Sequence, residues 1–263
     1  MSHDRHVSLQ DINKNGGVSG DDILVPTASR FEKLYLAPEQ PVAGALRQTF
    51  GNPTPVALGG FLLANTPASI MLMGWGGAGG GTGNASAGIG TYYFLGAICL
   101  YAGGIGEWIL GNTFPSVVFF TFGGFWATFG ATLTPFFNAI AAYETADGFY
   151  DSFAIFLIFM CLLCFIYMIA ALRTNVCLVL ILFTFVLAFP CLAASYFDAA
   201  RGELGLSSTL RIAGGAFAFS GSVIAWYLWT SMIMESVDFP IALPVGDLSK
   251  MIKGRSEKIK DAV

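Results

Sequence analysis

Six long apolar segments restrict the fold of this chain more than any other feature. Each is long enough to cross the hydrocarbon core of a bilayer, about 30 Å thick, which needs roughly 20 apolar residues at helical rise. Glu107 is the one charged residue well inside any of them. Backbone groups in lipid need internal partners, and segment 176–197 lacks the alternation of a barrel strand. We therefore predict an all-α membrane protein, a six-transmembrane-helix bundle, with spans near residues 53–74, 87–110, 114–137, 152–172, 176–197 and 212–234.

The composition agrees with a chain that lies mostly in lipid. Of its 263 residues, 55% are hydrophobic and 11% are charged, whereas a water-soluble domain carries about 25% charged residues. The 13 Lys and Arg residues form no one-faced basic stripe, and the net charge of −4 argues against nucleic acid as a partner. All five cysteines lie in apolar segments, so we predict no disulfide framework. The expected partner is the lipid bilayer.

Lysine and arginine residues predict the orientation of the chain, because cytoplasmic loops retain positive charge. Most of them lie in the two terminal tails, whereas the connection 138–151 carries three acidic residues and no basic one. We expect both termini to be cytoplasmic, and we expect no cleaved signal peptide. The predicted regions are a largely mobile N-terminal tail (1–48), a six-helix transmembrane domain (49–238) and a C-terminal tail (239–263).

The spans contain few groups that could catalyse a reaction. Both histidines, His3 and His6, lie in the N-terminal tail, and no span holds a pair of carboxylates at helical spacing. Cys161 and Cys164 have the spacing of a redox pair, but their wholly apolar helix favours simple packing of both thiols. We therefore expect no enzymatic activity, no catalytic residue, no cofactor and no metal site.

The start of the first span is an unusual stretch, Asn52-Pro53-Thr54-Pro55. Asn52 is a favourable N-cap and Pro53 suits the first helical position, so the positive end of the helix dipole would attract a carboxylate there. The two prolines lack amide donors, which leaves the side chains of Asn52 and Thr54 as candidate substrate-binding groups. We also expect Pro67 to interrupt this helix. The first span is therefore the strongest candidate for a solute pathway.

The third span carries threonines on one face. Thr121 and Thr128 are separated by seven residues, which places both hydroxyls on the same side of a helix. They are candidate substrate-binding residues along a path for a small polar solute. The alternative is that each hydroxyl bonds a carbonyl of its own helix, a common use of threonine.

Glu107 is an acidic residue inside the second span, and such residues are functional candidates by default. It could hold a proton or shape a vestibule together with Asn112. The alternative is a residue at headgroup level, held there by Trp108 and Asn112. The sequence leaves both interpretations open.

Several ordered motifs resemble the acetate uptake transporter family, which includes fungal acetate transporters and the bacterial acetate and succinate permease. The likeness extends over residues 50–247. The motifs are Asn52-Pro53-Thr54-Pro55 followed by Phe61, Glu107 ahead of Gly111-Asn112-Thr113-Phe114, Gly124-Phe125-Trp126, and Leu243-Pro244-Val245-Gly246-Asp247.

The resemblance implies a monocarboxylate path through each six-helix protomer and a ring-shaped homohexamer in the plasma membrane. It also implies a hydrophobic constriction of three side chains, matched here by Phe61, Phe122 and Phe183, where the last two depart from the family's Tyr and Leu. A narrow apolar constriction blocks ions by dewetting, so acetate would pass when the ring opens or the acid crosses in its neutral form. Thr54 also departs from the family's Ala, which bears on substrate identity.

The expected function is a plasma-membrane transporter or channel for acetate and related short-chain monocarboxylates, gated by the hydrophobic constriction. Proton coupling, or symport, is a hypothesis that rests on Glu107. Two alternatives stay open. One is an ammonium or ammonia export pathway, which some fungal relatives suggest, and the other is an acetate-binding sensor that does not transport.

Overall fold

The computed structural model describes residues 50–249 and 251–252. Six of its helical segments are long and apolar enough to cross a membrane, which confirms the predicted all-α bundle of six spans. The predicted tail 1–48 lies outside the described residues. The long helices are α3 (Thr54–Met73), α5 (Ile98–Ile109), α6 (Thr113–Leu133), α7 (Ala146–Ala171), α8 (Val176–Ala200) and α9 (Leu204–Ser236).

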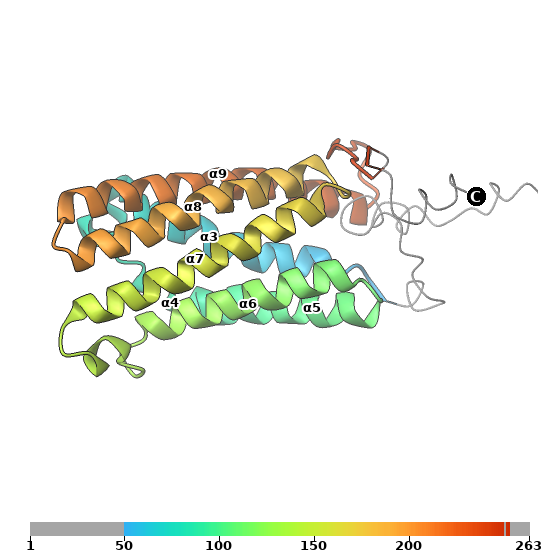
Figure 1. The fold of residues 1–263 in the computed structure, drawn as a ribbon. Helices are drawn as coiled ribbons and strands as arrows, with labels where there is room; N and C mark the ends of the chain where they lie inside the picture. The colour runs from blue at the N-terminus through green and yellow to red at the C-terminus, as the bar shows by residue number, and fades with distance from the viewer. Residues whose placement is uncertain (1–49, 250, 253–263) are drawn as a thin grey trace, which may run out of the picture.

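The helices form a closed ring in the order α3, α5, α6, α7, α8 and α9. Packing contacts join α3 to α5, α5 to α6, α7 to α8, α8 to α9 and α9 to α3. Aromatic pairs close the remaining side between α6 and α7, with ring centroids 6.0 Å apart for Phe114 and Tyr167 and 6.2 Å apart for Phe125 and Phe156. The start of α3 and the segment that follows α9 lie at the same end of the bundle, here called the terminal end (Figure 1). The opposite end, which holds the connections 74–85, 134–145 and 201–203, is the loop end.

The first span starts one residue later than predicted and is not interrupted. Helix α3 begins at Thr54 with Pro53 as its N-cap, while Asn52 accepts a hydrogen bond from the Thr54 amide at 2.9 Å. Asn52 therefore accepts a hydrogen bond from the start of the helix, but it lies one residue before the N-cap. The helix continues through Pro67 to Met73, so the predicted break is wrong. Proline removes one amide donor, and the turns on either side keep their own hydrogen bonds.

The second span combines several helical types. After η2 (Ser86–Gly88) and α4 (Ile89–Thr91), a π-helical segment, η3 (Tyr92–Ala97), leads into α5. The hydroxyl group of Tyr92 donates to the Ala85 carbonyl at 2.9 Å and so ties the segment to the preceding loop. A Cβ atom on Gly96 would lie 2.9 Å from Cγ of Trp126, so only glycine lets α6 approach this closely. The missing side chain at Gly96 therefore lets the second span pack closely against α6.

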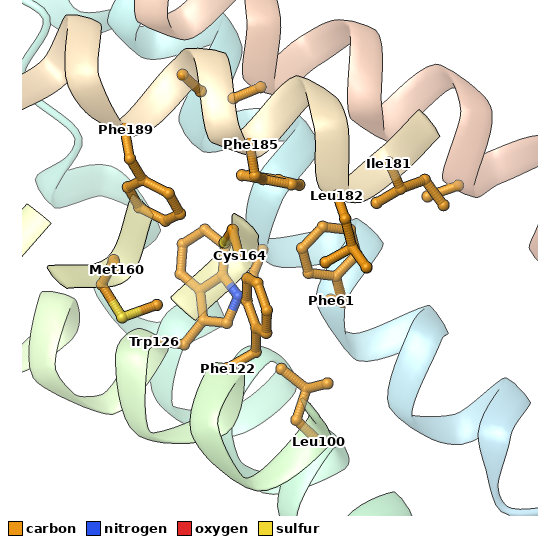
Figure 2. Packing of buried hydrophobic residues seen from close by; sticks show 14 of the residues in the cluster. Phe61, Leu100, Phe122, Trp126, Met160, Cys164, Ile181, Leu182, Phe185 and Phe189 are labelled. Carbon is orange, nitrogen blue, oxygen red and sulfur yellow. The ribbon is translucent and has the colours of Figure 1, made fainter. Parts of the chain in front are cut away.

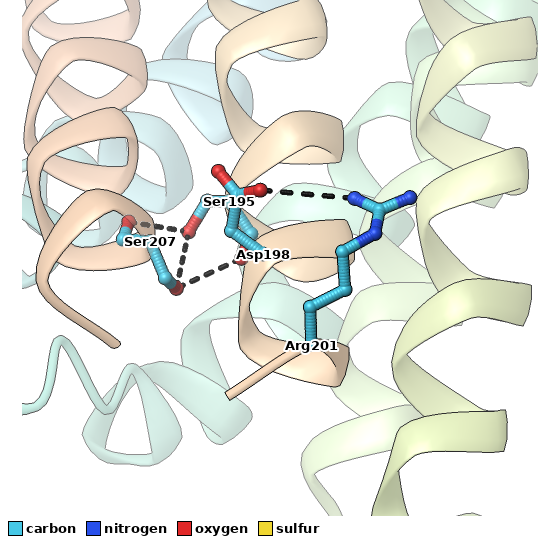
Figure 3. Close-up of polar contacts among 4 residues, drawn as sticks. All are labelled: Ser195, Asp198, Arg201 and Ser207. Carbon is cyan, nitrogen blue, oxygen red and sulfur yellow. Dashed lines mark hydrogen bonds and ion pairs between the residues drawn. The ribbon is translucent and has the colours of Figure 1, made fainter. Parts of the chain in front are cut away.

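Helices α7 and α9 begin earlier than the hydropathy pattern predicted, at Ala146 and Leu204. The additional turns of α9 contain Ser207, Ser208 and Thr209, and Ser207 pairs with α8. Ser195 donates to the Ser207 carbonyl at 2.7 Å, and Ser207 donates to the Ser195 carbonyl at 2.8 Å (Figure 3). On the same turn of α8 the guanidinium of Arg201 lies 3.7 Å from the Asp198 carboxylate. The two serine hydrogen bonds join α8 and α9 beyond the apolar region.

A short segment at the terminal end, residues 243–248, packs across the ends of three helices, and we call it the terminal strap. The Val176 amide donates to the Gly246 carbonyl at 2.8 Å, and the Leu248 amide donates to the Thr174 carbonyl at 3.0 Å. The Tyr227 hydroxyl of α9 donates to the Pro244 carbonyl at 2.7 Å. The strap thus connects the α7–α8 junction to α9.

Candidate solute pathway

Three phenylalanines from α3, α6 and α8 meet inside the helix ring. Phe61, Phe122 and Phe185 are all buried, and their ring centroids lie 5.8 to 6.3 Å apart in edge-to-face arrangements. Figure 2 shows their side chains converging from three helices. We call this group the phenylalanine triad. Because non-adjacent helices contribute its members, the triad lies on the axis of the ring and not between two neighbours.

The structure brings two of the three predicted constriction residues together and replaces the third. Phe183 lies on the outer face of α8 with 46% of its surface exposed. Residues two positions apart in a helix are separated by about 200° around its axis, so the side chains of Phe183 and Phe185 point in nearly opposite directions. The predicted place of Phe183 beside Phe61 and Phe122 is therefore corrected to Phe185. Segment 176–197 is apolar on both faces, and its hydrophobic pattern could not distinguish the two residues.

Glu107 lies in a buried polar cluster near the terminal end. Its side chain is fully buried, with 0% of its surface exposed. The hydroxyl group of Thr54 and the amide of Asn112 each donate to one of its carboxylate oxygens. The cluster joins the start of α3 to the end of α5 and the start of α6. Such donors offset part of the cost of burying a carboxylate. The predicted pairing of Glu107 with Asn112 is present, and Thr54 is the additional partner.

The other predicted binding residues lie apart from the triad. Asn52 is exposed at the terminal end. The Thr121 hydroxyl donates to the carbonyls of Val117 and Val118 in its own helix and lies 3.1 Å from the hydroxyl of Tyr167. Thr128 is exposed on the outer face of α6. The three residues therefore line no common path within one chain.

One turn beyond the triad, towards the loop end, lies the buried side-chain amide of Asn65. Asn65 of α3 donates to the Ala218 carbonyl at 3.0 Å and to the Ser222 hydroxyl at 2.7 Å. Both partners belong to α9 and lie beside its glycines. The signal that could have identified Asn65 is a lone amide in the middle of an apolar span, which needs a partner from another helix.

The loop end carries a half-buried cationic group beside the glycine-rich connection. Arg211 of α9 donates to the Leu72 carbonyl and, at 3.2 Å, to the Ser208 hydroxyl. Gly83 has a φ of +72°, and a Cβ atom there would lie 2.1 Å from the guanidinium. A shallow depression of about 360 Å³, lined by Met71 and residues between 79 and 87, opens at this end of α3. A positive charge and an open hollow therefore occur on the same end of the bundle.

A closed ring of six membrane-spanning helices with an aromatic group on its axis defines the class of this protein, a multi-pass membrane protein with a candidate axial path. The profile of the GPR1/FUN34/yaaH family matches residues 35–250, and the chain belongs to that family. This confirms the predicted resemblance.

Curated relatives agree with that assignment. The chain is 42% identical over 234 residues to protein alcS of Aspergillus fumigatus, covering 85% of each chain. It is 29% identical over 245 residues to acetate permease A of Emericella nidulans, covering 90% of this chain and 78% of the relative. Ammonia transport outward protein 2 of Saccharomyces cerevisiae is 27% identical over 204 residues, covering 75% and 68%.

A solved structure has the same fold. The bacterial acetate channel SatP superposes with a TM-score of 0.62 at 20% sequence identity, covering 75% of this chain and 99% of that chain. At this level of identity the likeness concerns the arrangement of helices.

Proposed function

We propose that this protein is a transporter or channel for acetate and related short-chain monocarboxylates, with a path along the axis of each protomer. The phenylalanine triad is the observation that carries the proposal, because it places an apolar constriction where a path through the ring would run. The names of the relatives, acetate permease A and acetate channel SatP, support the choice of solute. We further propose a homohexamer in the plasma membrane with both termini cytoplasmic.

The geometry of the triad suggests how passage is controlled. Ring centroids 5.8 to 6.3 Å apart bring the ring edges into contact, which leaves no room for a hydrated carboxylate. Moving an unpaired carboxylate into an apolar site costs far more than moving its neutral acid. Acetate would therefore cross in its neutral form, or after the rings rotate apart.

We assign Glu107 to the vestibule at the terminal end and propose that it positions α3. Both of its oxygens accept hydrogen bonds, one from α3 and one from the start of α6, so the side chain ties these helices to the end of α5. That geometry favours a structural anchor over a proton carrier, because Thr54 and Asn112 would have to release the carboxylate of Glu107 before it could take part in proton coupling. Flux measured against membrane potential and pH distinguishes anion passage from proton symport.

The test compares alanine variants in liposomes loaded for uptake of labelled acetate. Phe61→Ala and Phe185→Ala each remove one member of the triad and are expected to raise flux several-fold and admit longer acids. Phe183→Ala is the matched control, because it removes the same side chain from the outer face of the same helix. The flux of each variant is divided by the mass of reconstituted protein, and only protein that elutes as a single peak in size-exclusion chromatography is used. Unchanged rate and selectivity in Phe185→Ala would remove the triad from the path.

Ammonia is a second candidate solute, supported by the relatives named ammonia transport outward proteins 2 and 3. Comparing acetate and ammonium flux in one preparation separates the two. If the purified protein binds acetate and the liposomes stay impermeable to both solutes, the sensor interpretation replaces transport.

A further inference from the structure

Trp126 of α6 carries a buried hydrogen-bond donor without a partner. Only 2% of its surface is exposed. Among the described residues, its indole Nε1 is one of two buried side-chain nitrogen or oxygen atoms that lack a hydrogen bond. The other, Oε1 of Glu235, belongs to the last turn of α9. Buried donors in folded proteins are nearly always paired, because leaving one unpaired carries a free-energy cost. An orphan donor in the middle of a core therefore needs an explanation.

The position of this donor relates it to the phenylalanine triad. Trp126 follows Phe122 by one helical turn, so it lies on the same face of α6 and nearer to the loop end. In the view of Figure 2 the indole nitrogen is on the edge of the ring nearest to Phe122. Asn65 and Phe189 follow Phe61 and Phe185 by the same four residues and contribute to the same level. The donor is thus one turn away from the constriction.

Packing holds the indole in this orientation. Its ring stacks on Tyr92 with centroids 5.1 Å apart, and Phe125 and Phe129 contact it at 5.3 Å and 6.1 Å in edge-to-face geometry. Gly96 of the π-helical segment removes the side chain that would push it away. These four neighbours therefore fix a donor to which none of them is hydrogen-bonded. A fixed donor binds an acceptor with little loss of conformational freedom.

The chemistry of the donor selects the ligand. An indole N–H donates and never accepts, so it can bind an oxygen of a carboxylate or a carboxylic acid, whereas an ammonium ion has no lone pair to accept that hydrogen bond. Asn65, on the same level, already donates to Ala218 and Ser222. Trp126 is therefore the donor available there, with the apolar rings of the triad to accommodate a short alkyl group.

We propose that Nε1 of Trp126 binds a carboxyl oxygen of the permeating monocarboxylate on the loop-end side of the phenylalanine triad. The inference rests on the proposed function and adds to it a specificity-determining residue. It makes the protein prefer carboxylic acids over ammonium at the step next to the constriction.

The first test uses the full chain in liposomes. Trp126→Phe keeps an aromatic ring and removes the donor, so the acetate concentration at half-maximal flux should rise about tenfold, which corresponds to ~1.4 kcal/mol. Ammonium flux should not change. Trp226→Phe is the matched control, since its indole already donates to Thr66 at 3.1 Å on the outer surface. A half-saturation equal to that of the parent protein, or an equal loss for acetate and ammonium, overturns the inference.

A second measurement works on the unaltered chain and does not depend on the folding of a variant. The protein contains five tryptophans, whose indole ¹⁵N–¹H resonances are assigned by single substitutions or by elimination. Titration with acetate should shift the Trp126 resonance downfield, and titration with ammonium chloride should leave it in place. An unmoved Trp126 resonance in a protein that transports acetate refutes the donor role and leaves the proposed function intact. Absence of acetate flux in the parent protein refutes the proposed function itself.

Discussion

Replacing Thr54 by Val removes one of the donors that hold the buried carboxylate of Glu107. Valine has nearly the same shape as threonine, so the packing of α3 against α5 is retained and the hydroxyl is lost. A hydrogen bond to a charged group contributes roughly 1.5–3 kcal/mol, and the full amount is lost when the acceptor stays buried. Because Glu107 has no exposed surface, we expect Thr54→Val to lower the free energy of unfolding by about 2 kcal/mol.

The assay is equilibrium unfolding in mixed detergent micelles, followed by tryptophan fluorescence. Thr128→Val is the control, because Thr128 is exposed on α6 and its substitution should change stability by less than about 0.5 kcal/mol. Adding Glu107→Gln to Thr54→Val should recover part of the loss, since the neutral amide costs less to bury. A loss below about 0.5 kcal/mol for Thr54→Val would show that this hydrogen bond does not anchor the helix.

Two further predictions concern the ends of the bundle. Gly83→Ala should destabilise the protein more than Gly80→Ala, because both glycines have positive φ but only at Gly83 would the new methyl group collide with Arg211. Thermal unfolding in detergent measures this, and equal melting temperatures for the two variants would contradict it. Tyr227→Phe removes the bond to Pro244 and should cost about 1 kcal/mol. It should also speed hydrogen exchange of the Val176 and Leu248 amides, and unchanged protection there would show that the terminal strap is held by other contacts.

The sequence predicted the number and type of spans because six segments were far too apolar for any other environment. It placed the starts of α7 and α9 too late, since their first turns are polar. In α9, Ser207 is satisfied by Ser195 of another helix, and hydropathy within one segment contains no information about such a partner.

The candidate site was predicted only where a local motif fixed the register. Phe61 follows the Asn-Pro-Thr-Pro motif and Phe122 precedes Gly-Gly-Phe-Trp, and the structure places both in the triad. In α8 no motif fixes the register, so Phe183 and Phe185 were equivalent by hydropathy. The role proposed for Trp126 depends on which neighbours leave its nitrogen unpaired. That property belongs to the packed structure and has no local signature in the chain.

The π-helical segment has a consequence for chimeras between members of this family. Each residue added to or removed from a helix turns everything beyond it by about 100°. Deleting one residue within Tyr92–Ala97 would therefore swing Glu107 away from Thr54 while the first half of the span kept its contact with Ala85. In a chimera of two relatives that differ in this segment, the junction should lie outside Tyr92–Ala97, so that the whole π-helical segment, and the helix rotation it sets, come from one parent.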